Sequence, residues 1–277
     1  MNVTDTITQI VGIYLVRNEE RFLDQVIVNT YDFCDKLIIV DNRSEDDSFL
    51  IAQKWANASQ KVELHTVQHP SEAHSFVQPF CGTNTWVFAV DGDELYDPYG
   101  LKEFRKEILS GKYDEWWIVF GNVLNCIALD TSPIQATGYL APPCRSMTKL
   151  YNFSAITNWV NCHTERMLGG NITFKDGWDE GKRLNLHEQF NWEDSKYRCL
   201  HVCFLQRSRI DKAKNNSIVS RQNPVELQNR GLRQRICSCI SFFGGKKQNS
   251  QWKTKKYMRG ELVEKDVSSF FFNFPRL

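Results

Sequence analysis

A short apolar run that ends in a cluster of acids is the feature that most constrains the fold of this chain. Residues 86–90 are Trp-Val-Phe-Ala-Val, and Asp91-Gly92-Asp93-Glu94 follows directly. The length of the run, its β-branched and aromatic content and its abrupt polar end predict an interior parallel strand. In open α/β sheets, ligands bind beyond the carboxyl ends of such strands. Carboxylates packed this closely raise one another's pKa unless a cation neutralises them, so the sequence predicts a divalent metal at this point.

Two earlier apolar runs end in the same way. Residues 10–16 lead into Arg17-Asn18-Glu19-Glu20, and residues 36–40 lead into Asp41-Asn42-Arg43-Ser44. Both runs therefore predict strands with polar residues at their carboxyl ends, where a site is expected.

Helical periodicity connects these runs. Apolar residues recur at helical spacing from Glu19 to about Phe33, which predicts an amphipathic helix that covers one face of the sheet. Ser44 and Asp47 have the spacing of a capping box for a second helix. With a further strand at 62–67, the alternation of strands and helices and the right-handed crossover rule predict an α/β fold with a mostly parallel, Rossmann-like sheet.

The three polar segments together carry a family resemblance. Arg17-Asn18-Glu19-Glu20, Asp41-Asn42-Arg43-Ser44 and Asp91-Gly92-Asp93-Glu94 stand in this order, each after a predicted strand. On these residues, roughly the first hundred positions resemble the nucleotide-binding half of glycosyltransferase family 2, which has the GT-A fold. Many members carry a second acid where this chain has Asn42. An amide still accepts a hydrogen bond from a base or ribose, so the difference bears on nucleotide identity.

The resemblance implies a nucleotide-diphospho-sugar donor, most readily a UDP- or GDP-sugar, and Mn²⁺ or Mg²⁺ as cofactor. It implies donor contacts at eight positions, which are Arg17, Asn18, Glu19, Asp41, Arg43, Asp91, Gly92 and Asp93. The metal ligands that it implies are Asp91, Asp93 and the late His201. Arg207 and Arg209 are expected to meet phosphate charge. Inversion at the anomeric carbon by direct displacement is the expected mechanism.

An inverting transfer needs a carboxylate base, and three candidates stand on the acceptor side. Glu165 is the first choice because it follows a Trp159 segment and His163, where relatives have an adjacent His/Glu pair; the spacing is one residue wider here. Asp179 comes second and Glu188 third. Prolines and a glycine between Pro133 and Pro143 predict a long irregular connection ahead of these residues.

Composition agrees with a globular enzyme. The chain has 277 residues with 34 basic and 33 acidic side chains, so its formal charge of +1 excludes a general attraction to nucleic acid. Nine cysteines are expected to be reduced thiols in a cytoplasmic protein, and no apolar run approaches the ~18 residues of a membrane span. The expected organisation is a catalytic domain at 1–210, with a donor side at 1–100 and an acceptor side at 101–210.

Residues 211–277 are expected to form a helical extension that packs on the core. Basic residues flank Cys and Phe between Arg230 and Lys247, and a peripheral membrane contact is the alternative to such packing. The run Phe270–Phe274 is too apolar to face water, so it should dock on the core or on another copy. The predicted function is a metal-dependent glycosyltransferase acting on a hydroxyl of a glycan or other acceptor. A nucleotidyltransferase acting on a sugar phosphate and a non-catalytic nucleotide-sugar-binding protein are the alternatives.

Overall fold

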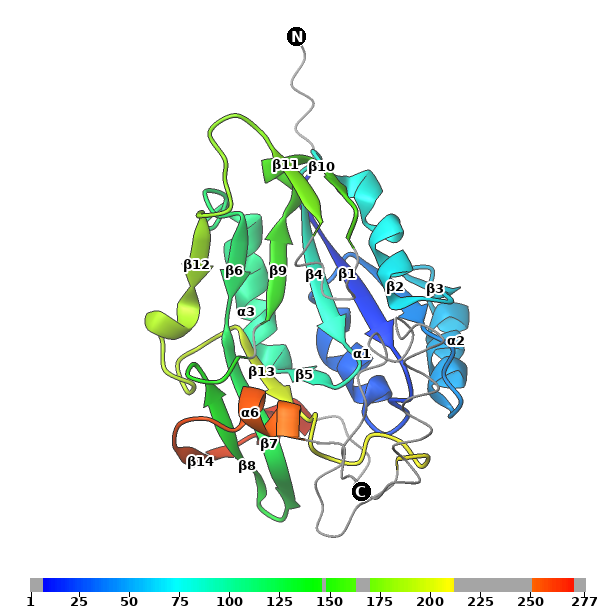
Figure 1. Ribbon diagram of the computed structural model, residues 1–277, viewed down its shortest axis with the longest axis vertical. Helices are drawn as coiled ribbons and strands as arrows, with labels where there is room; N and C mark the ends of the chain where they lie inside the picture. The colour runs from blue at the N-terminus through cyan, green and yellow to red at the C-terminus, as the bar shows by residue number, and fades with distance from the viewer. Residues whose placement is uncertain (1–6, 146–147, 163–169, 212–250, 272–277) are drawn as a thin grey trace, which may run out of the picture.

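A seven-stranded sheet forms the centre of the computed structural model, which describes residues 7–145, 148–162, 170–211 and 251–271 (Figure 1). The strand order is β12-β6-β9-β4-β1-β2-β3. Four strands run parallel in its amino-terminal half: β1 (Gln9–Val16), β2 (Lys36–Asp41), β3 (Val62–Thr66) and β4 (Thr85–Asp91). β9 (Lys149–Asn152) runs antiparallel between β4 and β6 (Ile118–Phe120), and β12 (Arg183–Asn185) forms the far edge. The predicted α/β class with a mostly parallel sheet is confirmed.

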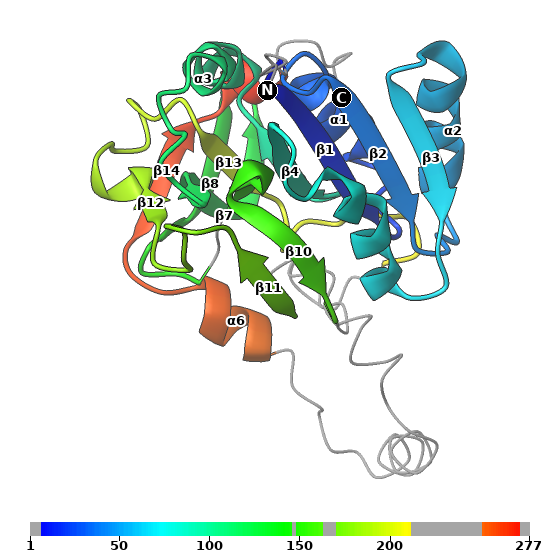
Figure 2. The same ribbon diagram turned by 90° about the horizontal axis from the view of Figure 1, so that it is seen from above.

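Two apolar cores lie on the two faces of this sheet (Figure 2). Helices α1 (Leu23–Tyr31), α2 (Ser48–Ala58) and α3 (Pro98–Leu109) contribute to the larger core. The 3₁₀ helices η1 (Pro70–Phe76) and η2 (Gln78–Phe80) and the hairpin of β10 (Ile156–Val160) and β11 (Asn171–Phe174) cover the other face. Helices or hairpins therefore cover both faces, which leaves the strand ends for a site.

The first helix begins later than its periodicity predicts. α1 starts at Leu23 because the chain turns before it: Asn18 has a left-handed φ of 59°. The predicted capping box at Ser44 is wrong. Asp47 is the N-cap of α2 but makes no side-chain cap bond, and the Ser44 hydroxyl accepts the Asn18 amide at 3.1 Å instead. The Ser44 side chain therefore links the loop after β2 to the loop after β1 and does not cap a helix.

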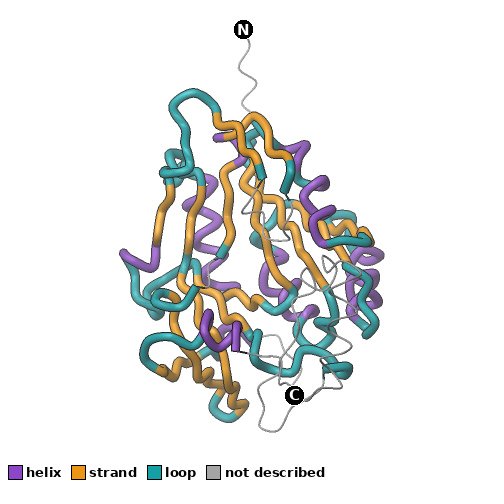
Figure 3. The backbone as a smooth tube through the Cα atoms, viewed as in Figure 1, coloured by secondary structure: helices purple, strands orange, loops and turns teal. Residues whose placement is uncertain are grey.

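A second, five-stranded sheet continues from the first (Figure 3). Its order is β14 (Leu262–Asp266), β8 (Ile134–Ala141), β7 (Asn122–Thr131), β13 (Arg198–His201) and β5 (Glu94–Tyr96). β4 passes into β5 through Gly92 and Asp93, so the acidic tetrapeptide lies where the chain crosses from one sheet to the other.

The irregular connection predicted between Pro133 and Pro143 is wrong. β7 and β8 form an antiparallel hairpin from Thr131 opposite Ile134 to Val123 opposite Ala141. Gly138 lies within β8 because the strands approach closely there: a Cβ on Gly138 would lie 2.2 Å from the Asn125 carbonyl oxygen. The glycine marks a close contact and not a loop.

The C-terminal segment returns to the core with α6 (Gln251–Tyr257), β14 and η5 (Ser268–Phe271). Phe270 is buried, and its ring stacks on Trp192 with centroids 5.8 Å apart. The predicted docking of the aromatic run is confirmed for Phe270 and Phe271, while Phe272–Phe274 lie outside the described residues. In the part of the chain that is described, no helix combines the length and the apolar character needed to cross a bilayer.

Candidate active site

Asp93 and His201 meet where the two sheets join. β5 and β13 pair antiparallel with Glu94 opposite His201, and the Val202 amide donates to the Asp93 carbonyl at 2.9 Å. This pairing places His201 Nε2 3.6 Å from Asp93 Oδ2. Nδ1 of the same ring lies 2.9 Å from Asn125 Oδ1 on β7. Because an amide oxygen only accepts, Nδ1 carries the hydrogen and Asn125 fixes Nε2 toward Asp93.

Arg207 is a second partner of Asp93. Its Nη1 donates a hydrogen bond to Asp93 Oδ2, the oxygen that faces His201, and lies 3.1 Å from Glu19 Oε1. All of these side chains are buried. Burial would raise the pKa of Asp93, but the positive charges of Arg207 and His201 hold that pKa well below its usual value. Asp93 is therefore an ionised, buried carboxylate with its own guanidinium counterion.

Asp91 is paired with a different cation. Its Oδ2 lies 2.7 Å from Lys149 Nζ, and Glu94 Oε1 lies 3.3 Å from the same nitrogen. Burial would lower the pKa of Lys149, but the charges of Asp91 and Glu94 outweigh burial and raise it. From the sequence alone, three crowded acids predict a divalent cation. The protein supplies cations of its own to these acids, Lys149 at Asp91 and Arg207 at Asp93.

Two of the three predicted metal ligands lie close enough together to bind one divalent ion. Within the described ranges, no three His, Cys, Asp or Glu side chains gather closely enough to hold a metal. Asp93 and His201 alone form a suitable pair, since a carboxylate oxygen and an imidazole nitrogen held by an outer hydrogen bond face each other. The third predicted ligand, Asp91, is engaged by Lys149 and is not gathered with them.

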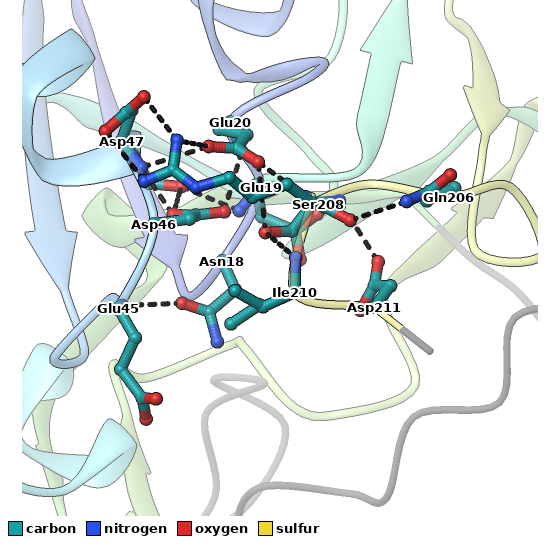
Figure 4. Close-up of polar contacts among 12 residues, drawn as sticks. Asn18, Glu19, Glu20, Glu45, Asp46, Asp47, Gln206, Ser208, Ile210 and Asp211 are labelled. Carbon is teal, nitrogen blue, oxygen red and sulfur yellow. Dashed lines mark hydrogen bonds and ion pairs between the residues drawn. The ribbon is translucent and has the colours of Figure 1, made fainter. Parts of the chain in front are cut away.

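The loops after β1 and β2 are hydrogen-bonded to each other (Figure 4). The Glu45 amide donates to Asn18 Oδ1 at 2.7 Å, and the Glu19 amide donates to Ser48 Oγ at 2.7 Å. Arg43 follows β2 with a left-handed φ of 56° and is exposed, while Arg17 is half-buried. The structure thus brings most of the predicted donor-binding residues to one edge of the sheet.

Residues 206–211 cross these loops. Glu20 carboxylate oxygens accept from Ser208 Oγ at 3.3 Å and from Arg209 Nη1 at 2.9 Å, and they accept the Asp47 amide at 3.1 Å (Figure 4). Asp47 also forms an ion pair with Arg209. Arg209 therefore joins Glu20 and Asp47 on the surface, while its neighbour Arg207 reaches the buried Asp93.

Two buried oxygens at the end of β2 point to a ligand. Asp41 Oδ2 accepts the Ser44 amide at 3.1 Å. Asp41 Oδ1 and Asn42 Oδ1 are buried and have no hydrogen-bond partner among the described residues. Leaving such acceptors unsatisfied costs about 1–3 kcal/mol each, so groups that donate hydrogen bonds are expected against them.

Gly92 is required by close packing across the turn. A Cβ on Gly92 would lie 2.6 Å from Glu19 Cγ. Glu19 in turn faces Arg207. The glycine thus lets the loop after β1 pack against the turn after β4.

The three candidate bases are separated by the fold. Asp179 precedes β12, which runs in the same direction as β4, so the amino end of β12 lies away from the carboxyl end of β4 (Figure 1). Asp179 Oδ1 accepts the Gly181 amide at 2.6 Å. Glu188 follows β12 at the carboxyl edge, in η4 (Leu186–Glu188), with a side chain that is 67% exposed. Three strand spacings separate β12 from β4, or about 14 Å. Glu165 and His163 lie outside the described residues.

Lys149 and Asn125 are the site residues that sequence reasoning missed. The signal for Lys149 was a lysine directly before the apolar pair Leu150 and Tyr151 in a predicted strand. The sequence around Asn125 gives no indication of its role, because that role depends on the pairing of β7 with β13. In this pairing Asn125 lies opposite His201.

No family model matches the chain. A curated protein of Rickettsia conorii, named an uncharacterized glycosyltransferase, is 25% identical over 162 residues, which are 57% of this chain and 54% of that protein. The chain is similar to a glycosyltransferase. It spans about half the length of this curated relative.

Solved structures give partial likenesses. A glucosyl-3-phosphoglycerate synthase of Mycobacterium tuberculosis, in complex with Mn²⁺, UDP-glucose and phosphoglyceric acid, has 15% identity and a TM-score of 0.38 over 54% of this chain and 58% of that chain. A mannosyltransferase of Pyrobaculum calidifontis, in complex with GDP-Man and Mn²⁺, has 16% identity and a TM-score of 0.32 over 44% and 36% of the two chains. Each likeness covers only part of both proteins.

Proposed function

We propose that this chain is a glycosyltransferase that moves a sugar from a nucleotide-diphospho-sugar to a hydroxyl of a glycan or other acceptor. The observation that carries the proposal is the buried Asp93 and His201 pair at the carboxyl edge of the parallel strands, the edge where β2 ends in the buried oxygens of Asp41 and Asn42 that have no partner among the described residues. Similarity to a curated glycosyltransferase supports the reaction class.

In this proposal the donor lies across the ends of β1, β2 and β4. Asp41 accepts a hydrogen bond from the base or ribose, where its Oδ1 has no partner among the described residues. Arg17, Asn18, Glu19 and Arg43 line the same edge. Asp91, whose side chain is 34% exposed, reaches a hydroxyl of the ribose or donor sugar. The carboxylate oxygens of Asp41 and Asp91 accept hydrogen bonds, so they suit a ligand that is rich in hydroxyl and N–H donors.

Asp93 and His201 would hold Mn²⁺ or Mg²⁺, with Asn125 fixing the imidazole ring. A bound ion supplies charge that stabilises the leaving diphosphate. Arg207 brings a further positive charge to the same carboxylate, and its Nε is buried without a partner in the described part of the chain. A guanidinium aimed at developing negative charge stabilises a transition state of this kind.

A carboxylate on the acceptor side takes the proton of the acceptor hydroxyl, and the sugar is transferred with inversion. Glu165 is the first candidate for this base, and the position of Glu188 at the carboxyl edge makes it the second.

The test is a panel of nucleotides and nucleotide sugars, read by thermal shift with and without Mn²⁺ and followed by a transfer assay. A ligand that binds only the native state raises the melting temperature by mass action. Asp93→Asn is expected to abolish transfer, while the exposed control Asp194→Asn keeps it. Release of nucleoside diphosphate supports transfer, whereas release of pyrophosphate would show a nucleotidyltransferase. A panel without any binding ligand would overturn the proposal.

A further inference from the structure

A buried lysine lies beneath the acidic turn. The Lys149 side chain is 5% exposed, whereas the side chain of Asp91, its partner, is 34% exposed. Lys149 Nζ lies 2.7 Å from Asp91 Oδ2 and 3.3 Å from Glu94 Oε1. An ammonium group taken out of water is costly unless carboxylates surround it, so the lysine depends on both acids.

The register of β4 and β9 directs Lys149 to Asp91. Lys149 pairs with Ala89, and the side chains of paired residues lie on the same face of the sheet. Asp91 lies two residues beyond Ala89 along β4 and shares that face. Because Ala89 is small, the lysine stem has room to run along the strand toward Asp91.

Glu94 is fixed by other bonds. Its Oε2 accepts the Asp91 amide at 3.1 Å and the Tyr96 hydroxyl at 3.3 Å, and its side chain is 6% exposed. Glu94 is therefore a buried structural carboxylate. Of the two acids on Lys149, only Asp91 has a surface that a ligand can reach.

Asp93 faces other partners, Arg207 and His201. The two aspartates of the motif are thus held by separate cations on separate elements.

We propose that Lys149 is a positioning residue that holds Asp91 against β9, away from the Asp93 and His201 pair, so that the exposed part of the Asp91 carboxylate accepts a donor hydroxyl instead of joining a metal ion. The inference rests on the proposed function, because it concerns how the donor is held. Lys149 acts only through Asp91 and touches no atom of the donor.

The test is a double-mutant cycle. Lys149→Met, Asp91→Asn and the double variant are compared for nucleotide-sugar affinity by calorimetry with Mn²⁺ present, and for kcat and KM. Each single variant is expected to weaken donor affinity roughly tenfold, as for loss of one charged hydrogen bond. The double variant is expected to bind no more weakly than Asp91→Asn, since Lys149 has nothing left to position. KM should rise more than kcat falls.

Lys149→Arg is the rescue variant, because it keeps a positive charge beside Asp91 and should recover most of the affinity. Lys36→Met is the matched control: Lys36 begins β2 at the other end of the sheet, where it pairs with Glu63 at 2.8 Å, and its loss should leave donor affinity unchanged. If Lys149→Met does not fold, the double variant, which removes both charges, and Lys149→Arg are compared with Asp91→Asn.

A further loss of donor affinity when Lys149→Met is added to Asp91→Asn would overturn the inference, because the lysine would then act on its own. A parent protein that binds no nucleotide sugar would instead refute the proposed function. If the parent protein binds the nucleotide sugar but the effects of Lys149→Met and Asp91→Asn on donor affinity are additive, only the proposed role of Lys149 is refuted.

Discussion

Arg207 donates its Nη1 hydrogen bond to the Asp93 oxygen that also faces His201 Nε2. A divalent ion on this oxygen would lie beside the guanidinium, and like charges at such a separation repel strongly when buried. On the proposed function, Arg207 and a metal ion would therefore compete for Asp93 when no donor is bound.

Arg207→Gln should raise the affinity of the nucleotide-free protein for Mn²⁺ by about tenfold, because it removes the guanidinium that occupies the Asp93 oxygen. Binding is measured by Mn²⁺ electron paramagnetic resonance or calorimetry. Arg209→Gln is the control, because Arg209 is exposed and pairs with Glu20 and Asp47 instead. An unchanged or lower Mn²⁺ affinity in Arg207→Gln would contradict the competition.

Gly92→Ala should weaken both the fold and the site. The new methyl would lie 2.6 Å from Glu19 Cγ, so Glu19 must move and its contact with Arg207 at 3.1 Å is disturbed. Overpacking of this kind costs about 1–3 kcal/mol. Urea unfolding gives the stability, and Mn²⁺ titration reports on the neighbouring Asp93. If Gly92→Ala has the same free energy of unfolding and the same Mn²⁺ affinity as the parent, the Glu19 side chain moves away from the new methyl group without cost.

Much of the amino-terminal half of the fold was predictable because its sequence signals are local. The runs that became β1, β2 and β4 are apolar, short and ended by polar residues, and burial on both faces makes such runs distinctive. Asp41, Asp91 and Asp93 could be predicted as candidate site residues because they stand directly at strand ends. The class of fold follows from the same pattern.

What was missed depends on contacts distant in sequence. Lys149 is separated from Asp91 by 58 positions, and Arg207 from Asp93 by 114. No local sequence pattern predicts these ion pairs. From the sequence alone, the crowded acids therefore indicate a bound metal ion and no other cation. Gly138 and the prolines predict a loop in place of the β7 and β8 hairpin because these residues usually mark loops, whereas here the glycine permits a close approach of two strands.

Asp41→Ala should weaken binding of the free nucleoside diphosphate as well as of the sugar nucleotide. Loss of a hydrogen bond to a charged group costs about 1.5–3 kcal/mol, which is about ten- to a hundredfold in affinity. Calorimetry with the nucleoside diphosphate measures the change. Asp32→Ala, an exposed carboxylate just after α1, is the control. Equal affinity of Asp41→Ala and the parent would remove Asp41 from the donor site.

Glu107 on α3 should make the fold sensitive to acid. Partial burial would raise its pKa, but hydrogen bonds from Lys196, Tyr113 and Lys112 lower it from 4.5 to about 2. A carboxyl whose pKa is lower in the folded state stabilises the fold above its unfolded pKa and loses this contribution as the pH falls through the folded value. The stabilisation that Glu107 contributes is therefore lost between about pH 4.5 and about pH 2.

Glu107→Gln removes this contribution. At pH 7 the variant should be less stable by about 1 kcal/mol, a value reduced for solvent screening. The difference from the parent should vanish near pH 2, as urea unfolding at several pH values would show. Glu103→Gln is the control, because Glu103 forms an exposed pair with Lys106 and should change little. A difference that persists at pH 2 would mean that Glu107 acts by packing.

Glu165→Gln should keep the affinity for donor and metal while losing about 10²- to 10⁴-fold in turnover, because general-base help is felt in the transition state. Donor binding by calorimetry and transfer rate are measured separately for Glu165→Gln, Glu188→Gln and Asp179→Asn. Asp179 lies at the amino end of β12, so Asp179→Asn should transfer sugar near the parental rate. Glu188 lies at the carboxyl edge and is the base if Glu165→Gln stays active. A product that keeps the donor's anomeric configuration by NMR would exclude inversion, and the carboxylate would then need a different role.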